Sequence, residues 1–166
     1  MKMRRLLLAA AIVLAGCART QAGSAPAPSD VSALEQELVA GVNRYRAEKG
    51  LPLLRPNARI ATIARRHSEA AARGETPLSD GQGRLRARAV SVSMPVQTWA
   101  EDVVEGRIPA AADVAQRLTE RLIATGRAHL EDAQFEDVGI GIARDPAGTY
   151  YLTQLLILSR GGYQRP

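Results

Sequence analysis

Few side chains in this sequence could carry acid–base or metal chemistry, and those that stand out lie far apart along the chain. The two histidines are His67 and His129, the single cysteine is Cys17, and Glu101 is a carboxylate close to Trp99. An imidazole titrates near neutral pH, and burial beside an aromatic ring can raise the pKa of a carboxylate. Glu101 with either histidine could therefore act as a general base in hydrolysis.

Each of these residues also has a structural interpretation. His67 falls on the apolar face of an expected helix, where a hydrogen-bonded core histidine is commoner than a ligand or a base. His129 fits a helix C-terminus or the surface, and it also fits an imidazole turned toward a cavity. Glu101 suits a hydrogen-bonded scaffold role as well as an acid–base role, and Gln154 can satisfy backbone groups inside a sheet. These patterns alone therefore assign no catalytic residue.

The short motifs of common enzymes and nucleotide sites are absent from the sequence. It has no G-x-S-x-G, H-E-x-x-H or P-loop pattern, and Gly139 and Gly141 lack the third glycine and the following helix of a dinucleotide site. A single cysteine provides neither an intramolecular disulfide nor a thiolate metal cage. The few, dispersed aromatic residues offer no platform for stacking bases, so we expect no nucleic-acid partner.

The N-terminus carries a targeting signal. Three cations, Lys2, Arg4 and Arg5, precede an apolar run over residues 6–16, which ends at Cys17. This run is much shorter than the roughly 20 residues that span a membrane, so it indicates a secretory signal. Without those three cations, the 22 Lys and Arg residues fall to 19 against 17 Asp and Glu, and the remaining chain is close to neutral.

Residues 14–17, Leu-Ala-Gly-Cys, resemble the bacterial lipobox. The resemblance implies that residues 1–16 are removed, that Cys17 is acylated, and that the lipid anchors the protein to a membrane of the cell envelope. Ala18 after the cysteine implies the outer membrane if the host has two membranes. Two acyl chains are enough for stable anchoring. The alternative is an ordinary signal peptide followed by a free cysteine.

Hydrophobic spacing predicts the elements that would position the candidate residues. Residues 17–33 combine the acylated cysteine with a flexible Ala, Pro and Ser-rich tether, residues 34–160 form one domain, and residues 161–166 form a C-terminal tail. We expect helices from about Asp30 to Lys49, from Asn57 to Gly74 and from Pro109 to about Gly126, a loop over 75–84, and strands near 90–99, 138–143 and 150–158. Helices first and a hairpin last predict an α+β layered fold.

Several segments, in this order, resemble the CAP superfamily, also called the SCP-like domain. Residues 43–53, NRYRAEKGLPL, are similar to the family's N-x-x-R-x-x-x-G-L opening, and Glu101 stands in the place of its E-N motif. Residues 127–135 precede strands at 138–142, VGIGI, and 150–154, YYLTQ, which are similar to two family strands. The resemblance covers about residues 34–158, nearly the whole expected domain.

The resemblance implies a three-layer α/β/α sandwich with a small, mainly antiparallel sheet and a shallow cavity. Relatives commonly place two histidines and two glutamates there, which can hold a divalent cation. The positions of those histidines correspond here to Leu78 and Gly126, and Glu101 is kept, while Asp102 replaces the adjacent asparagine and Glu120 is the nearest candidate for the second acid. Without the imidazoles we expect no metal and no other cofactor. The cavity candidates are Glu101, His129, Gln154, Leu78 and Gly126.

These observations predict a lipid-anchored, extracytoplasmic CAP-type protein. We expect it to bind an unidentified ligand or envelope partner without catalysis, and to meet the membrane through acylated Cys17. Two alternatives remain open. One is a cation-assisted hydrolase or peptidase-like enzyme that uses Glu101 with His129 or His67, and the other is a small-lipid binder, as some members of the resembled family are.

Overall fold

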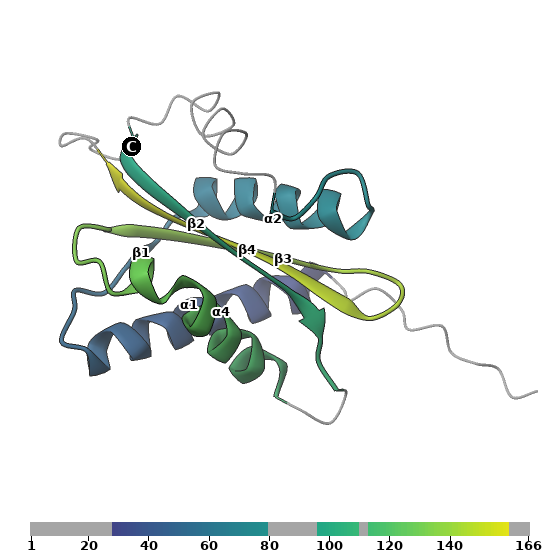
Figure 1. Ribbon diagram of the computed structural model, residues 1–166, viewed down its shortest axis with the longest axis horizontal. Helices are drawn as coiled ribbons and strands as arrows, with labels where there is room; N and C mark the ends of the chain where they lie inside the picture. The colour runs from purple at the N-terminus through teal and green to yellow at the C-terminus, as the bar shows by residue number, and fades with distance from the viewer. Residues whose placement is uncertain (1–27, 80–95, 110–112, 160–166) are drawn as a thin grey trace, which may run out of the picture.

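A four-stranded sheet lies between two layers of helices in the computed structural model (Figure 1). The structure describes residues 28–79, 96–109 and 113–159. The strands are β1 (Arg55–Pro56), β2 (Val96–Arg107), β3 (Asp137–Arg144) and β4 (Thr149–Ser159). Their order in the sheet is β1-β3-β4-β2, with β1 parallel to β3 and the other neighbours antiparallel. The expected layered fold with a mainly antiparallel sheet is confirmed.

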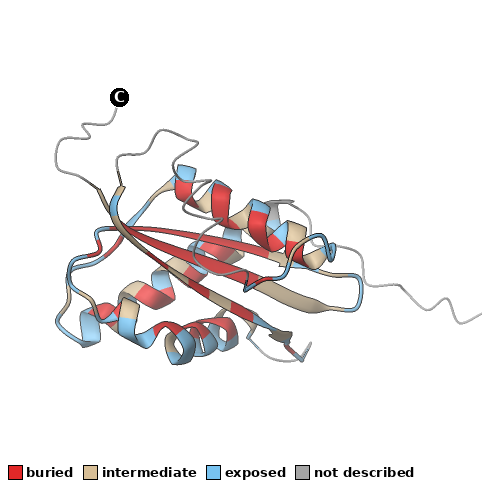
Figure 2. Cartoon of the chain, turned by 45° about the horizontal axis from the view of Figure 1, so that its top comes forward, coloured by how far each residue is buried: buried red, intermediate tan, exposed pale blue. Residues whose placement is uncertain are grey.

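Three helices cover the two faces of the sheet. Helices α1 (Pro28–Glu48) and α4 (Val114–Leu130) pack on one face, and α2 (Ala58–Ala72) packs on the other (Figure 1). Most of β3 and the central part of β4 are buried, whereas β2 is mostly half-buried, and each helix turns its buried residues toward the sheet (Figure 2). None of these described helices is both long enough and apolar enough to cross a membrane.

Side chains from alternate strand positions form two separate cores. Leu152 and Leu156 of β4 join the larger core beneath α1 and α4, whereas Leu155 and Ile157 join a smaller core beneath α2. This division follows from the period of two in a strand, which sends successive side chains to opposite faces. Consequently, successive residues along β2 or along β4 lie in different cores.

Two glycines of β3 allow α2 to pack with its backbone almost touching the sheet. A Cβ on Gly139 would lie 2.3 Å from the backbone nitrogen of Ala61, and a Cβ on Gly141 would lie 1.9 Å from that of Arg65. Neither distance is compatible with a side chain. The VGIGI pattern therefore records close packing of a helix on a strand, with the intervening apolar residues facing the opposite core.

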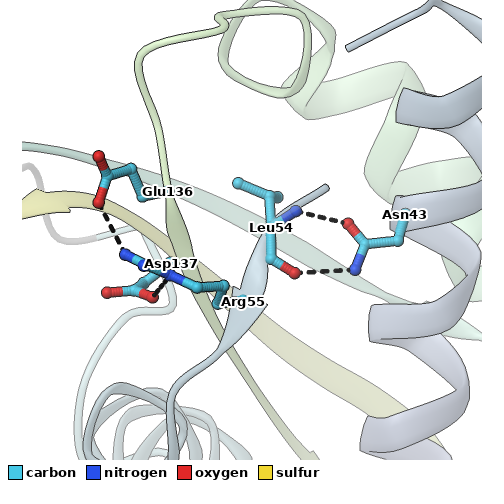
Figure 3. Close-up of polar contacts among 5 residues, drawn as sticks. All are labelled: Asn43, Leu54, Arg55, Glu136 and Asp137. Carbon is cyan, nitrogen blue, oxygen red and sulfur yellow. Dashed lines mark hydrogen bonds and ion pairs between the residues drawn. The ribbon is translucent and has the colours of Figure 1, made fainter. Parts of the chain in front are cut away.

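Short strand β1 is fixed at the edge of the sheet by side chains from both sides. The Asn43 amide donates to the Leu54 carbonyl and its oxygen accepts from the Leu54 backbone N–H, both at 2.9 Å (Figure 3). Arg55 donates to Asp137 at 3.0 Å and to Glu136 at 2.7 Å (Figure 3). The asparagine and arginine thus hold two residues of chain beside β3.

The limits of two helices differ from those expected. Helix α1 begins at Pro28, so residues 28–33 are helical and not part of a tether. A proline is favourable in a first helical turn, and Asp30 in that turn complements the helix dipole. Helix α4 begins at Val114 instead of Pro109, because the Asp113 carboxylate caps it by accepting from the Gln116 backbone N–H at 2.9 Å.

Other expectations are confirmed in the described residues. Asn57 caps α2 through its side-chain oxygen, Gly74 has φ +72° just beyond the end of that helix, and residues 137–159 form the expected hairpin. The cysteine at position 17, the first part of the strand expected at 90–99, and the tail at 161–166 lie outside the described residues.

Substitution of Gly141 by Ala tests the close packing of α2 on β3. The added methyl group would meet the backbone of α2, so we expect the free energy of unfolding to fall by about 3 kcal/mol. Gly50→Ala is the control, because Gly50 has φ +69° with open space around it and should cost only about 1 kcal/mol of backbone strain. Urea denaturation measures both; equal losses would show that the contact does not require glycine.

Candidate functional site

The acidic candidates on β2 lie on opposite faces of the sheet. Glu101 faces α2, where its Oε1 lies 3.8 Å from Nδ1 of His67. Asp102 faces α4, where its Oδ1 lies 2.8 Å from Nδ1 of His129. Because successive strand residues point in opposite directions, the structure does not bring Glu101 and His129 together. Two separate acid–imidazole pairs result.

The pair on the α2 face belongs to a buried hydrogen-bonded cluster. His67 is fully buried, and its Nδ1 lies 3.0 Å from Oγ1 of Thr153 on β4. Ser68 lies 3.0 Å from the same hydroxyl and donates to the Gly141 carbonyl, also at 3.0 Å. The cluster therefore joins α2 to β3 and β4, and the expectation that His67 is a hydrogen-bonded core histidine is confirmed.

The pair on the α4 face is centred on the carboxylate of Asp102, which is 5% exposed. Its Oδ1 accepts from Nδ1 of His129, and its Oδ2 accepts from Nε2 of Gln154 at 3.0 Å. Gln154 is fully buried and stands directly opposite Asp102 in the β2–β4 ladder. The side chain of Gln154 thus binds a neighbouring carboxylate, whereas the sequence suggested backbone groups.

Gly126 makes room for this carboxylate. A Cβ on Gly126 would lie 2.5 Å from Cγ of Asp102. At Gly126 the backbone leaves helical geometry, with φ −101° and ψ 17°, but α4 continues to Leu130. The glycine is therefore a kink inside the helix and not its end, and the additional turn brings His129 to Asp102.

Buried Arg46 holds the end of that additional turn. Its guanidinium donates through Nη1 to the carbonyls of Leu130 at 2.8 Å and Asp132 at 3.0 Å, and through Nε to the Pro52 carbonyl at 2.8 Å. Burial lowers the pKa of Arg46, and the negative charge of Asp132 opposes that shift. Arg46 thus acts as a positioning residue for the segment that carries His129.

The remaining family positions do not add ligands. Leu78 is buried in the segment after α2, and neither it nor Gly126 carries an imidazole. Glu120 lies on the exposed side of α4, where it accepts from Gln116 at 3.0 Å and Arg117 at 3.1 Å. Among the residues that the structure describes, no three His, Cys, Asp or Glu side chains are grouped as a metal site requires.

Asp102 is the site residue that sequence reasoning missed. The resemblance identifies Glu101 as a cavity candidate, and it identifies Asp102 only as the residue that replaces the family's asparagine. The signal that could have found it was available in the sequence: two adjacent carboxylates in a strand must face different layers, and each layer supplies one histidine. Only the packing of α4 identifies which histidine meets which carboxylate.

The pattern of the CAP family, the cysteine-rich secretory protein family, matches residues 39–156. The chain belongs to the CAP family. Comparison with curated proteins gives no match. The kink at Gly126 and the Asp102–His129 pair therefore lie within the CAP domain of this chain.

Solved structures similar to this CAP domain come from several bacteria. A cysteine-rich secretory protein of Staphylococcus aureus is 20% identical over 80% of this chain and 40% of its own, with a TM-score of 0.63. An extracellular SCP-domain protein of Bacillus anthracis is 22% identical over 80% and 44%, also with a TM-score of 0.63. An outer surface protein of Borrelia burgdorferi is 8% identical over 83% and 99%, with a TM-score of 0.65. This chain thus spans less than half the length of the first two, and all three share its fold.

The contact between Gly126 and Asp102 can be tested by a double-mutant cycle. Gly126→Ala should lower the free energy of unfolding by about 2 kcal/mol, because its methyl group would overlap the carboxylate. In an Asp102→Ala background the overlap is gone. Alanine can adopt the φ of −101° at this position and restricts the unfolded chain more than glycine does, so the same change should be neutral or stabilising by up to about 1 kcal/mol. Urea denaturation of the four proteins decides; additive effects would contradict the contact.

Proposed function

We propose that this CAP-domain protein is held at the cell envelope by lipid on Cys17, acts outside the cytoplasm, and binds a ligand or partner without catalysis. The observation that carries the non-catalytic part is the separation of Glu101 and Asp102 onto opposite faces of the sheet. Each carboxylate has a single imidazole neighbour. The sheet separates the two pairs, so their four side chains do not meet in one cavity. In this function, the residues at the family's cavity positions contribute to packing and not to catalysis.

The burial of the Glu101–His67 pair supports this proposal. His67 has no exposed surface, and the Glu101 side chain is 9% exposed, so an external substrate has little access to either group. A general base must come within hydrogen-bond reach of the proton that it removes. The hydrogen bonds from this cluster to Thr153 and Gly141 instead serve the packing of α2 on the sheet.

The anchor is supported by the N-terminal sequence and by the start of the fold. Cations, a short apolar run and Leu-Ala-Gly-Cys precede the domain, and α1 begins at Pro28. Residues 18–27 could extend over at most roughly 35 Å, which would keep the domain close to the membrane surface. The similar proteins described as secretory, extracellular or outer surface proteins fit the same location.

Metabolic labelling tests the anchor. Cells that express the full chain with a clickable palmitate analogue should incorporate label into the wild type and not into Cys17→Ala. The variant should also remain unprocessed or lose its membrane association, because an acyl chain contributes about 0.8 kcal/mol per buried CH₂. Cys17→Ala is thus the negative control for the wild type. Absence of label on the wild type would refute the lipoprotein assignment.

A second candidate function is favoured by one observation, the geometry of the Asp102–His129 pair. The imidazole donates from Nδ1 to a buried carboxylate, and the His129 side chain is 39% exposed. Nε2 is therefore the ring nitrogen left for other contacts, and a carboxylate on Nδ1 is the arrangement that orients a histidine base. The hydrolase alternative would thus use Asp102 in place of Glu101.

Hydrolysis of an ester and peptide substrate panel distinguishes the two functions. We expect the wild type and His129→Gln to show the same background turnover, because the proposed function is binding without catalysis. Thermal unfolding of both proteins controls for damage to the fold. Wild-type turnover that is lost in His129→Gln and in Asp102→Asn, with melting temperatures unchanged, would instead establish the hydrolase.

A further inference from the structure

A cavity of about 420 Å³ opens at the β1 edge of the sheet, away from both acid–imidazole pairs. Helices α1 and α2 form the walls of the cavity, and the backbone of β3 forms its floor. The apolar and small residues that line the cavity are Val39, Ala58, Ala61, Val138, Gly139 and Ile140. The volume lies within the range of about 300 to 1,000 Å³ that is common for ligand sites. The cavity thus has the size of a binding site and a backbone floor.

The floor of this cavity is a sheet edge that β1 covers only in part. β1 pairs with β3 at Asp137 and Val138 and then leaves the sheet, because Asn57 begins the turn into α2. The next residues of β3, Gly139 and Ile140, line the cavity. From this point β3 has β4 on one side and the cavity on the other.

The hydrogen bonds on either side define the direction of the exposed backbone. The Val138 carbonyl accepts from the Asn57 backbone N–H at 2.8 Å, and the Ile142 N–H donates to Oε1 of Glu35 at 3.2 Å. Strand backbone groups alternate in direction with a period of two. Ile140 lies midway between these residues, so its N–H and C=O face the same edge and the cavity.

The charge of the cavity selects against an ionic ligand. Among the described residues that line it, Glu35 and Arg65 are the only ionisable ones, and they bind each other, with Arg65 Nε 2.8 Å from Glu35 Oε1. The other polar groups of the lining are the hydroxyls of Ser32 and Thr62 and the amides of Gln36 and Asn57. A neutral ligand that both donates and accepts hydrogen bonds suits this surface.

We propose that this cavity binds an extended peptide segment of a partner protein, which adds a short strand to β3 at Ile140. A peptide backbone is neutral and presents both donors and acceptors, which the Ile140 backbone would pair. The small side chains of Ala58 and Ala61 leave space for alternate side chains of the peptide. The inference does not depend on lipid at Cys17 or on the chemistry of His129.

Ala58→Trp is the variant that tests the site. Ala58 is exposed at the first position of α2 and lines the cavity, so a tryptophan there would fill it without replacing a core residue. Ala47→Trp is the matched control, since Ala47 is exposed near the end of α1 and does not line the cavity. Each protein is the chain from Cys17 to Pro166 with Cys17→Ser, which keeps every described element of the fold.

The probe is a pool of neutral, N-acetylated and C-amidated heptapeptides with varied apolar and hydroxyl side chains. We expect the wild type and Ala47→Trp to select the same peptides, and Ala58→Trp to bind them at least tenfold more weakly. Bound peptide should slow exchange of the Ile140 backbone amide at least tenfold, as measured by nuclear magnetic resonance. Thermal unfolding confirms that Ala58→Trp is folded.

Three results would overturn the proposal. The first is that the wild type selects no peptide more strongly than Ala58→Trp does. The second is that selected peptides leave exchange at Ile140 unchanged, which would place them elsewhere on the protein. The third is saturable binding of laurate that Ala58→Trp abolishes, with no peptide selected, which would assign the cavity to acyl chains.

Discussion

The arrangement of this domain depends on the contact between the backbone of α2 and the backbone of β3. Only glycine at positions 139 and 141 permits that approach. The contact brings Ser68 and His67 within hydrogen-bond distance of β3 and β4, and it places the small residues of α2 beside the open edge of β3. A side chain at either glycine would push α2 outward and separate both groups of residues from the sheet.

Periodic features of this fold could be predicted from the sequence because they depend on local physics. The apolar face of α2, its cap at Asn57 and the hairpin of β3 and β4 all follow from residue spacing and turn chemistry. The limits of α4 could not be found in this way. Gly126 has the residue type of a helix end, but its function here is to admit a side chain from β2, which is distant in the sequence.

The candidate site was predictable only as a set of residues. The sequence indicates four of the residues that the site contains: Glu101, His129, Gln154 and Gly126. Their contact partners, however, depend on the face of the sheet toward which each carboxylate of β2 points. That choice is fixed by the β2–β4 register, which pairs Asp102 with Gln154 and places both beneath α4. Strand register is a long-range property, and a shift of one residue would exchange the environments of Glu101 and Asp102.

The buried guanidinium of Arg46 has a consequence for how the domain folds. Two of its carbonyl partners, at Leu130 and Asp132, are 84 and 86 residues away in the sequence. An intermediate that contained only α1 and α2 would have to leave Arg46 in water, since a buried cation without its acceptors is strongly unfavourable. The core around α1 can therefore close only when the end of α4 arrives, and this requirement couples α1 to the end of α4 in a single cooperative transition.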